Sequence, residues 1–225
     1  MDLEDAPVVV TGGTGALGTA VVGRLITAGA QCFVPNLNAQ QLKSFAHASH
    51  ERVHISEGVD LTDDAAVATF YSRLPKLWAS LHIAGGFATA PLAGTTSDDF
   101  SHMMRTNALT CFLCCREAAN VMATRPWRAG GGRLVNVAAR PGLEPRTGAG
   151  MTAYAASKAA VAALTEALGE ELISTGIWVN AVAPSIIDTA NNRAAMPTAE
   201  HGRWPTPEQI AETIVFLASP ANRAT

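Results

Sequence analysis

The sequence predicts an α/β protein built on a doubly wound parallel sheet. Two observations support this class: short apolar runs of strand length alternate with longer runs of helical periodicity, and a glycine-rich turn joins the first strand to the first helix. No repeat, low-complexity tract or linker divides the chain. We therefore expect residues 1–225 to form one domain with a full hydrophobic core.

Each predicted strand is an apolar run that leads through a short turn into an amphipathic segment. The first strand holds a run of valines, and the helix after it carries apolar residues at helical spacing up to Ile26. By the same criteria we expect strands at 7–11, 31–36, 53–56, 79–84, 132–138 and 177–183, and helices at 16–29, 39–48, 63–74, 97–124, 152–175 and 207–218. Right-handed crossovers favour the strand order 3-2-1-4-5-6, with a ligand crevice between the first and fourth strands.

The glycine turn, Gly12-Gly-Thr-Gly-Ala-Leu-Gly18, predicts a Rossmann-type dinucleotide site because it stands between a strand and a helix. Gly12 permits a tight turn, Gly15 lets the backbone approach a pyrophosphate, and Gly18 lets the helix pack closely on the strand. Unpaired N–H groups at the helix start favour phosphate. The expected cofactor is NAD(H) or NADP(H).

Tyr154 and Lys158 form the second informative pattern. They stand four residues apart at the head of a predicted helix, so their side chains share one face. A cation beside a phenol favours the phenolate and lowers the pKa of the tyrosine. Such a phenol can give or take a proton while a substrate is reduced or oxidised.

Composition excludes several classes of partner. The net charge is −3 and charged residues make up 16% of the chain, so nothing favours nucleic acid or an anionic membrane surface. No apolar run approaches the roughly 20 residues that cross a bilayer. The acidic start Met1-Asp-Leu-Glu-Asp5 argues against a signal peptide. We expect a cytoplasmic protein with a small-molecule substrate.

The cysteines raise the question of a metal site. Cys111-x-x-Cys114 has the form of half a zinc site, but no second ligand pair stands at finger spacing. The cysteines instead recur at helical spacing, as a buried helix face does. We therefore expect no metal, and we expect His47 and His50 to be exposed at a helix end.

The glycine turn and the Tyr–Lys pair together resemble the short-chain dehydrogenase/reductase family, from about residue 6 to about residue 219. The resemblance implies a Rossmann domain in which Tyr154 and Lys158 act with Asn107, which would support a water relay. Lys158 would also bind the nicotinamide ribose. The positions implied to contact the cofactor are Gly12, Thr14, Gly15, Leu17, Gly18, Asn36, Asp60, Leu61, Ala84, Gly85, Gly86, Tyr154, Lys158, Pro184, Ile187 and Thr189. A seventh strand follows the last helix in the family, and we expect it to be missing from this chain.

The chain departs from the family pattern at the substrate. Ala139 stands where most members carry a serine that polarises the substrate carbonyl, and losing one such donor costs on the order of 2–4 kcal/mol at the transition state. Thr147 or Thr152 is a candidate replacement. His82 stands where an asparagine is usual.

These departures resemble the dihydropteridine reductase branch, which also lacks the serine. The shared segments include the glycine turn, the run 84–87, Tyr154 and the stretch 188–197 with Trp204. The resemblance implies reduction of a quinonoid dihydropterin, a conjugated ring that needs less polarisation than a ketone. Phe87, Ala139, Met196 and Trp204 are the predicted substrate positions, and residues 184–206 are predicted to form a loop that covers the substrate. In the alternatives, Phe87 only packs under its loop and residues 184–206 are an ordinary surface loop.

The predicted function is an NAD(P)H-dependent short-chain oxidoreductase. Two alternatives stay open: a carbonyl reductase or alcohol dehydrogenase of the same family, and a catalytically silent dinucleotide-binding sensor. Asn36 ends the second strand where an acid would select NADH, so we expect a weak cofactor preference that tilts toward NADH. The helices 97–124 and 152–175 carry surplus apolar residues, which predicts a homodimer or homotetramer. These residues include Cys111, Phe112, Met122, Val161, Leu164 and Leu168.

Overall fold

The computed structural model describes residues 3–128 and 131–223. They form a six-stranded parallel sheet whose strands follow the predicted order 3-2-1-4-5-6. The fold class and the strand order are therefore confirmed. The strands are β1 (Pro7–Thr11), β2 (Gln31–Asn36), β3 (Val53–Glu57), β4 (Ala79–His82), β5 (Gly132–Val137) and β6 (Ile177–Val182).

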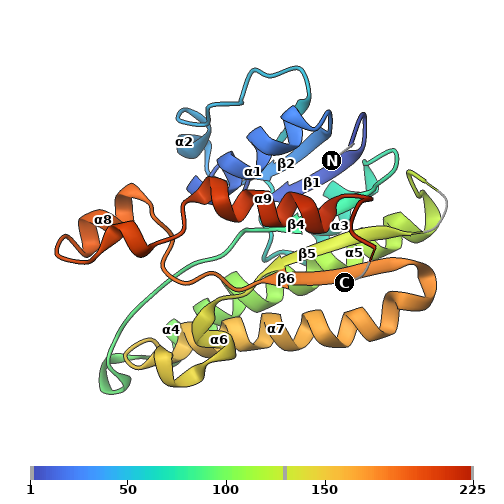
Figure 1. Ribbon diagram of the computed structural model, residues 1–225. Helices are drawn as coiled ribbons and strands as arrows, with labels where there is room; N and C mark the ends of the chain where they lie inside the picture. Colours follow the sequence, from blue (N-terminus) through green and yellow to red (C-terminus); the bar gives the residue numbers. More distant parts are fainter. Residues whose placement is uncertain (1–2, 129–130, 224–225) are drawn as a thin grey trace.

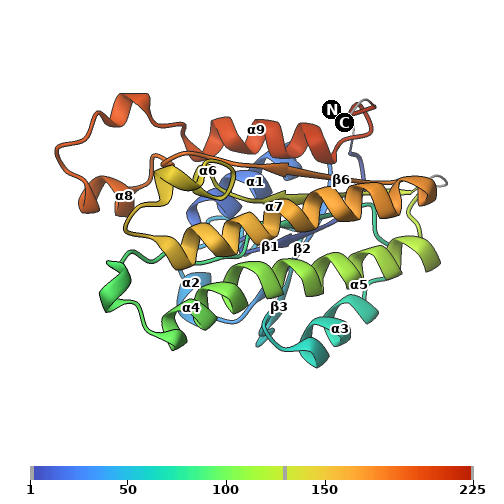
Figure 2. The ribbon, with the colours of Figure 1, turned by 90° about the horizontal axis from the view of Figure 1, so that it is seen from below.

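Helices cover both faces of the sheet. They are α1 (Ala16–Thr27), α2 (Ala39–Leu42), α3 (Asp64–Ser72), α4 (Ser97–Met103), α5 (Thr110–Thr124), α6 (Arg140–Leu143), α7 (Thr152–Leu172), α8 (Ala190–Ala195) and α9 (Pro207–Ala218). Figures 1 and 2 show α1 and α9 on one face and α3, α5 and α7 on the other, with a hydrophobic core in each layer. In the described part of the chain, no helix has both the length and the apolar character that a membrane crossing requires.

Local sequence signals set where the helices begin. Thr206 and Gln209 form a capping box at the start of α9, where Pro207 takes the first helical position. Thr96 and Asp99 form the same motif at the start of α4. Each cap stands at the end of a long connection that leaves the carboxyl end of a strand, β4 before α4 and β6 before α9. The cap therefore fixes the residue at which that connection ends.

The predicted helix 97–124 contains an irregular turn. Between α4 and α5 the chain forms a π-helical turn, Met104–Leu109. Turns of this kind occur often at functional sites because they displace side chains from the regular helical pattern. This one carries Asn107, one of the predicted catalytic residues.

The predicted helix 39–48 is wrong in length, because α2 ends at Leu42 and turns continue toward β3. His47 and His50, which we expected to be exposed, are half-buried. The His47 ring packs edge-on against Phe45, with the ring centroids 5.7 Å apart. The apolar pattern of this segment comes from packing around a turn rather than from a helix.

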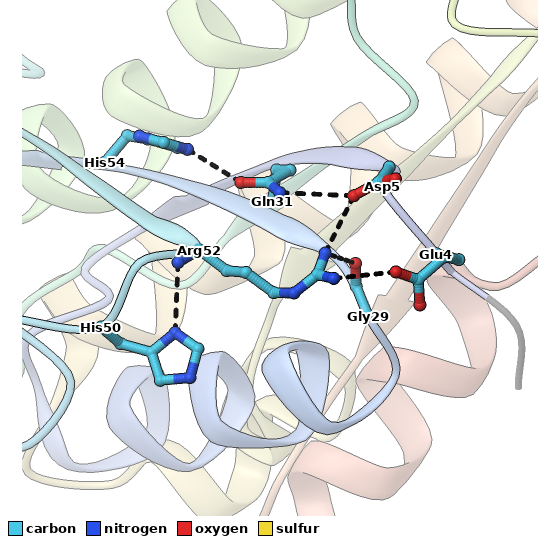
Figure 3. Close-up of polar contacts among 7 residues, drawn as sticks. All are labelled: Glu4, Asp5, Gly29, Gln31, His50, Arg52 and His54. Atoms are coloured by element: carbon cyan, nitrogen blue, oxygen red, sulfur yellow. Dashed lines mark hydrogen bonds and ion pairs between the residues drawn. The ribbon is translucent and has the colours of Figure 1, made fainter.

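Arg52 holds this turn to the start of the chain (Figure 3). Its guanidinium donates to the carboxylates of Glu4 at 2.8 Å and Asp5 at 2.9 Å and to the carbonyl of Gly29. Its backbone N–H donates to Nδ1 of His50 at 3.2 Å. The hydrogen bond from Arg52 lowers the pKa of the Asp5 carboxyl group. These bonds hold the turn before β3 against the N-terminal segment. The turn occupies residues that we had expected to belong to a longer α2.

Part of the apolar surface that we expected to support self-association lies in the core. Cys111, Met122 and Val161 are buried, because α5 and α7 pack against the sheet through them. Phe112 remains 40% exposed and Leu164 is half-buried. Fewer residues than expected are therefore available for a subunit contact.

Candidate active site

The glycine turn is packed tightly enough to exclude side chains at two of its positions. Gly12 has a φ of 66°, and a Cβ atom there would lie 2.7 Å from the backbone nitrogen of Ala84. A Cβ atom at Gly18 would overlap the carbonyl oxygen of Gly12. A Cβ atom at Gly15 would lie 3.4 Å from the carbonyl oxygen of Gly12, an ordinary contact, so the fold alone does not require a glycine there. Gly15 is the N-cap of α1, and because it has no side chain, no capping group occupies the N–H groups of the first helical turn. These groups favour a phosphate.

Thr11, which sequence reasoning missed, joins the glycine turn to the loop after β4. Its hydroxyl donates to the carbonyl of Leu81 at 3.4 Å and accepts from the N–H of Ala84 at 3.2 Å. The second bond ends β4 at His82, two residues before the predicted boundary. The predicted cofactor residues Ala84, Gly85 and Gly86 therefore begin directly beside Gly12.

Asn36 lies where the ribose of the adenosine is expected. Its side chain is 5% exposed, and Thr14 Oγ1 lies 3.2 Å from its Oδ1 and 3.1 Å from Oε1 of Gln41. The Nδ2 group of Asn36 is buried without a hydrogen-bond partner, so a ribose hydroxyl oxygen is a fitting acceptor. Gln41 was not predicted, because α2 is too short to give it a clear periodic position.

A cleft of about 720 Å³ runs along this side of the sheet. It is lined by Thr14 and Gly15 on one wall and by Thr189 and Arg193 on the other. Arg193 forms a bidentate ion pair with Asp188, in which its NH2 group lies 2.7 Å from Oδ2. The cleft brings the first and last predicted cofactor segments together. Together with the start of α1 and the unpaired Nδ2 group of Asn36, it fits the adenosine and phosphate part of a dinucleotide.

Several other predicted cofactor positions do not line this cleft and instead make contacts within the fold. Asp60 accepts from the backbone N–H and the hydroxyl of Thr62, both at 2.8 Å, so it shapes the turn after β3. Pro184 accepts from the N–H of Arg140, which ties the ends of β5 and β6. Leu61, Ile187 and Leu17 pack against or within the two cores.

Asn107 joins the cofactor loop to the catalytic helix. Its Oδ1 accepts from the N–H of Gly86 at 2.9 Å, and its Nδ2 donates to the carbonyl of Gly86 at 3.1 Å. The same Nδ2 donates to Ser157 Oγ at 2.9 Å, and Ser157 in turn donates to the carbonyl of Tyr154. Asn107 is only 1% exposed. Its side chain is a clamp between the loop and α7, and Ser157 is a residue of this site that the sequence did not reveal.

Burial controls the two titrating groups of α7. Lys158 is 6% exposed, and its Nζ donates to the carbonyl of Val137 at 2.7 Å. Burial lowers the pKa of Lys158 to about 8 and raises the pKa of Tyr154. The sequence predicted the opposite direction for the tyrosine, from the nearby ammonium alone. The structure gives a raised pKa instead, because the phenol loses water on burial and this loss is the cause of the shift.

The predicted substrate positions divide into two groups. Phe87 packs edge-on against Tyr154 with the ring centroids 4.9 Å apart, and 62% of Phe87 is exposed. Ala139 is buried two residues beyond Val137, the acceptor of Lys158. Phe87 is therefore an exposed aromatic ring beside Tyr154 rather than a residue packed under its loop, and its contact with a substrate stays a prediction.

Trp204 lines a different hollow, and Met196 is joined to it only through His201. Trp204 lines a pocket of about 460 Å³ with Asp188 and Gln209, and it packs against His201 with ring centroids 4.6 Å apart. His201 also bonds to the carbonyl of Met196 at 2.8 Å. Among the described residues, no recorded contact links either side chain to Tyr154. The connection 184–206 holds α8 and projects past the end of the sheet in Figures 1 and 2.

Neither threonine is established as a replacement for the missing serine. The hydroxyl of Thr147 donates to the carbonyl of Glu144 at 2.8 Å, so it is engaged within its own turn. Thr152 is exposed at the first position of α7. A carbonyl substrate would therefore find the Tyr154 phenol but no serine hydroxyl at position 139.

Comparison with known proteins identifies the class. A family model described as short chain dehydrogenase matches residues 6–200, and the chain belongs to this family. The chain is 30% identical over 239 residues to 4-formylbenzenesulfonate dehydrogenase of Comamonas testosteroni, covering 97% of this chain and 92% of that protein. It is 32% identical to 2-dehydro-3-deoxy-L-rhamnonate dehydrogenase (NAD(+)) of Sphingomonas sp., covering 94% and 87%.

A solved structure shares the same fold. The short-chain type dehydrogenase/reductase from Mycobacterium ulcerans superposes with a TM-score of 0.87 at 22% identity, covering 98% of this chain and 86% of that one. Family membership and the named relatives together make the protein an oxidoreductase of the short-chain class.

Proposed function

We propose that the protein is an NAD(P)(H)-dependent reductase in which Tyr154 supplies the proton. The observation that carries this proposal is the chain of contacts from Gly86 through Asn107 and Ser157 to the backbone carbonyl of Tyr154, which joins the cofactor loop to the helix that carries the acid. A bound nicotinamide supplies the hydride. Because burial raises the pKa of Tyr154, the phenol is protonated at neutral pH and ready to donate.

Lys158 and Asn107 support this proton transfer. The ammonium of Lys158 stabilises the phenolate that forms when Tyr154 gives up its proton, and it binds the nicotinamide ribose. Asn107 holds the loop and helix in register and supports a water relay to Lys158. A silent sensor is the weaker hypothesis, because binding alone requires neither a buried ammonium nor a phenol beside it.

The substrate class follows from Ala139. Without a hydroxyl at this position, a conjugated ring that already accepts hydride, such as a quinonoid dihydropterin, is favoured over a simple ketone. Phe87 offers an exposed aromatic edge beside Tyr154 for such a flat ring. A second candidate is a carbonyl or alcohol substrate, which the names of the relatives favour.

The cofactor and assembly proposals rest on individual contacts. The buried amide of Asn36 offers a donor to a 2′-hydroxyl and no charge to a 2′-phosphate, which favours NADH modestly. The printed name of one relative contains NAD(+). A homodimer or homotetramer through α5 and α7 would cover the exposed ring of Phe112.

The direct experiment is a cofactor-oxidation screen of the purified protein with NADH and NADPH. The panel contains a quinonoid dihydropterin, several ketones and several aldehydes, compared by kcat/KM. We expect the dihydropterin to exceed the ketones. If carbonyl compounds are clearly better, the second candidate replaces the first, and if nothing is turned over the oxidoreductase proposal fails.

A further inference from the structure

A buried cluster of sulfur and nitrogen donor atoms lies between β4 and α5. His82 extends from β4, and Cys111 and Cys115 extend from one face of α5, because they stand four residues apart. The donor atoms of these three side chains all lie within 4.8 Å of one another. Their exposed fractions are 4%, 4% and 1%. Three soft or borderline ligands thus face each other away from water.

The Nε2 atom of His82, which faces away from the cluster, already has a hydrogen-bond partner. Nδ1 faces the cluster and lies 3.3 Å from Cys115 Sγ, while Nε2 lies 2.9 Å from Ser80 Oγ. The Ser80 hydroxyl in turn lies 2.8 Å from the phenol of Tyr71. A histidine that binds a metal through one nitrogen usually donates its other N–H to such a partner, which fixes the tautomer.

A fourth donor stands beside these three. Asn136 Oδ1 lies 2.7 Å from His82 Nδ1 and 3.5 Å from Cys115 Sγ. The Nδ2 of Asn136 donates to Thr165 Oγ1 at 2.9 Å, so the amide oxygen is oriented toward the cluster. Asn136 is fully buried.

We propose that His82, Cys111 and Cys115 bind one zinc ion, with Asn136 Oδ1 at the fourth position. Zn–S bonds of about 2.3 Å and Zn–N or Zn–O bonds of about 2.0–2.1 Å place tetrahedral donors about 3.3–3.8 Å apart. The sulfur and nitrogen donors, which lie within 4.8 Å of one another, must therefore move closer together, and the amide oxygen of Asn136 must move away from His82 Nδ1, now at 2.7 Å. Binding displaces the protons of both thiols and leaves the Nε2 proton of His82 directed at Ser80.

Charge favours zinc over the other metals that thiolates select. Two thiolates neutralise Zn²⁺, while the imidazole and the amide add no charge. Copper(I) in the same site would leave a net negative charge in the core, where an unpaired charge is costly.

This site would fasten α5 to β4 close to the active site. β4 leads directly into the cofactor loop, and Cys111 follows Asn107 by one helical turn. From the sequence, Cys111 and Cys114 had the form of half a zinc site, and we expected no metal because no second ligand pair stood at finger spacing. The pair four residues apart becomes visible only when His82 is placed opposite it.

The test is to measure zinc in the reduced full-length protein. The chain, without a metal-affinity tag, is unfolded with chelator and thiol reductant, refolded with Zn²⁺, and dialysed before elemental analysis. We expect close to one zinc ion per chain. Refolding with Co²⁺ should produce thiolate-to-cobalt charge-transfer absorption in the near ultraviolet.

Variants separate the ligands from general effects on the core. Cys111→Ser and Cys115→Ser should lose the ion and the cobalt band, whereas the matched control Cys114→Ser on the same helix should retain both. Ser80→Ala, which keeps all ligands, should weaken zinc binding by about 10- to 100-fold. Circular dichroism confirms that each variant is folded, and Ser80→Ala tests the site if a ligand variant does not fold.

Three results would overturn the proposal. One is refolded wild-type protein that retains no zinc, and another is loss of zinc in Cys114→Ser equal to that in Cys111→Ser. The third is a preference for copper(I) over zinc in direct competition.

Discussion

The nucleotide side and the catalytic side of the candidate active site are built on different physical principles. The nucleotide side depends on missing side chains: Gly12 and Gly18 have no space for a Cβ atom, and Gly15 leaves a helix start open. The catalytic side depends on side chains whose chemistry is set by burial, above all Tyr154 and Lys158. Steric requirements can be recognised in the residue types alone. Proton affinities require the surrounding structure.

The largest expected effect is on the catalytic side. Tyr154→Phe should lower kcat by about 100- to 10,000-fold, because it removes the group that transfers the proton. The dissociation constant of the cofactor, measured by fluorescence titration, should change little, since the nucleotide side is intact. A variant with nearly normal kcat would show that another group is the acid.

The next effect concerns the missing donor. Ala139→Ser restores a hydroxyl that is worth up to about 2–4 kcal/mol for a developing oxyanion, so kcat/KM for ketones should rise more than that for a dihydropterin. Ala139→Cys is the matched control, because it adds similar bulk with a poor donor. An equal change for both substrate classes would contradict the proposed role of position 139.

A smaller effect is expected where the two sides meet. Ser157→Ala removes the hydroxyl between Asn107 and the backbone of Tyr154 and should lower the free energy of unfolding by about 1–3 kcal/mol. Denaturant unfolding measures this, and kcat should fall with little change in KM for the cofactor. Ser157→Thr should recover part of kcat, and an unaltered kcat in both variants would show that the clamp is structural only.

The smallest effect is on cofactor choice. The unmodified protein should prefer NADH over NADPH by less than about 100-fold, on the order of 2.7 kcal/mol. Asn36→Asp should increase this preference, because a carboxylate repels a 2′-phosphate and binds a 2′-hydroxyl. The ratio of kcat/KM values for the two cofactors measures it, with Asn36→Ser as the uncharged control. A strong preference for NADPH would mean that a basic residue reaches the site.

The comparison also explains which predictions succeeded. The strand order could be predicted because it depends on the periodicity of apolar residues. The close packing at Gly12 and Gly18 could be predicted because it depends on the absence of a side chain. The length of α2 was wrong because turns around Phe45 and His47 produce an apolar pattern like that of a helix. Thr11 and Ser157 could not be recognised, since a lone hydroxyl gains its role only from a distant backbone partner.

Two further differences have the same origin. The direction of the Tyr154 pKa was wrong because a sequence shows the neighbouring charge but not the loss of water. Cys111 and Cys115 were grouped with a buried helix face, which is correct, but their position opposite His82 depends on how α5 crosses β4.

The most direct test of the account is the pH dependence of kcat/KM for the reduced cofactor at a saturating level of the second substrate. This constant reports the ionisation of the free enzyme, so it should fall as pH rises through about 8, where buried Lys158 loses its proton. Lys158→Arg should remove this decline, because a guanidinium stays charged. A profile that is flat up to pH 10 in the unmodified protein, or an unchanged decline in Lys158→Arg, would contradict the claim that burial sets proton affinity on the catalytic side.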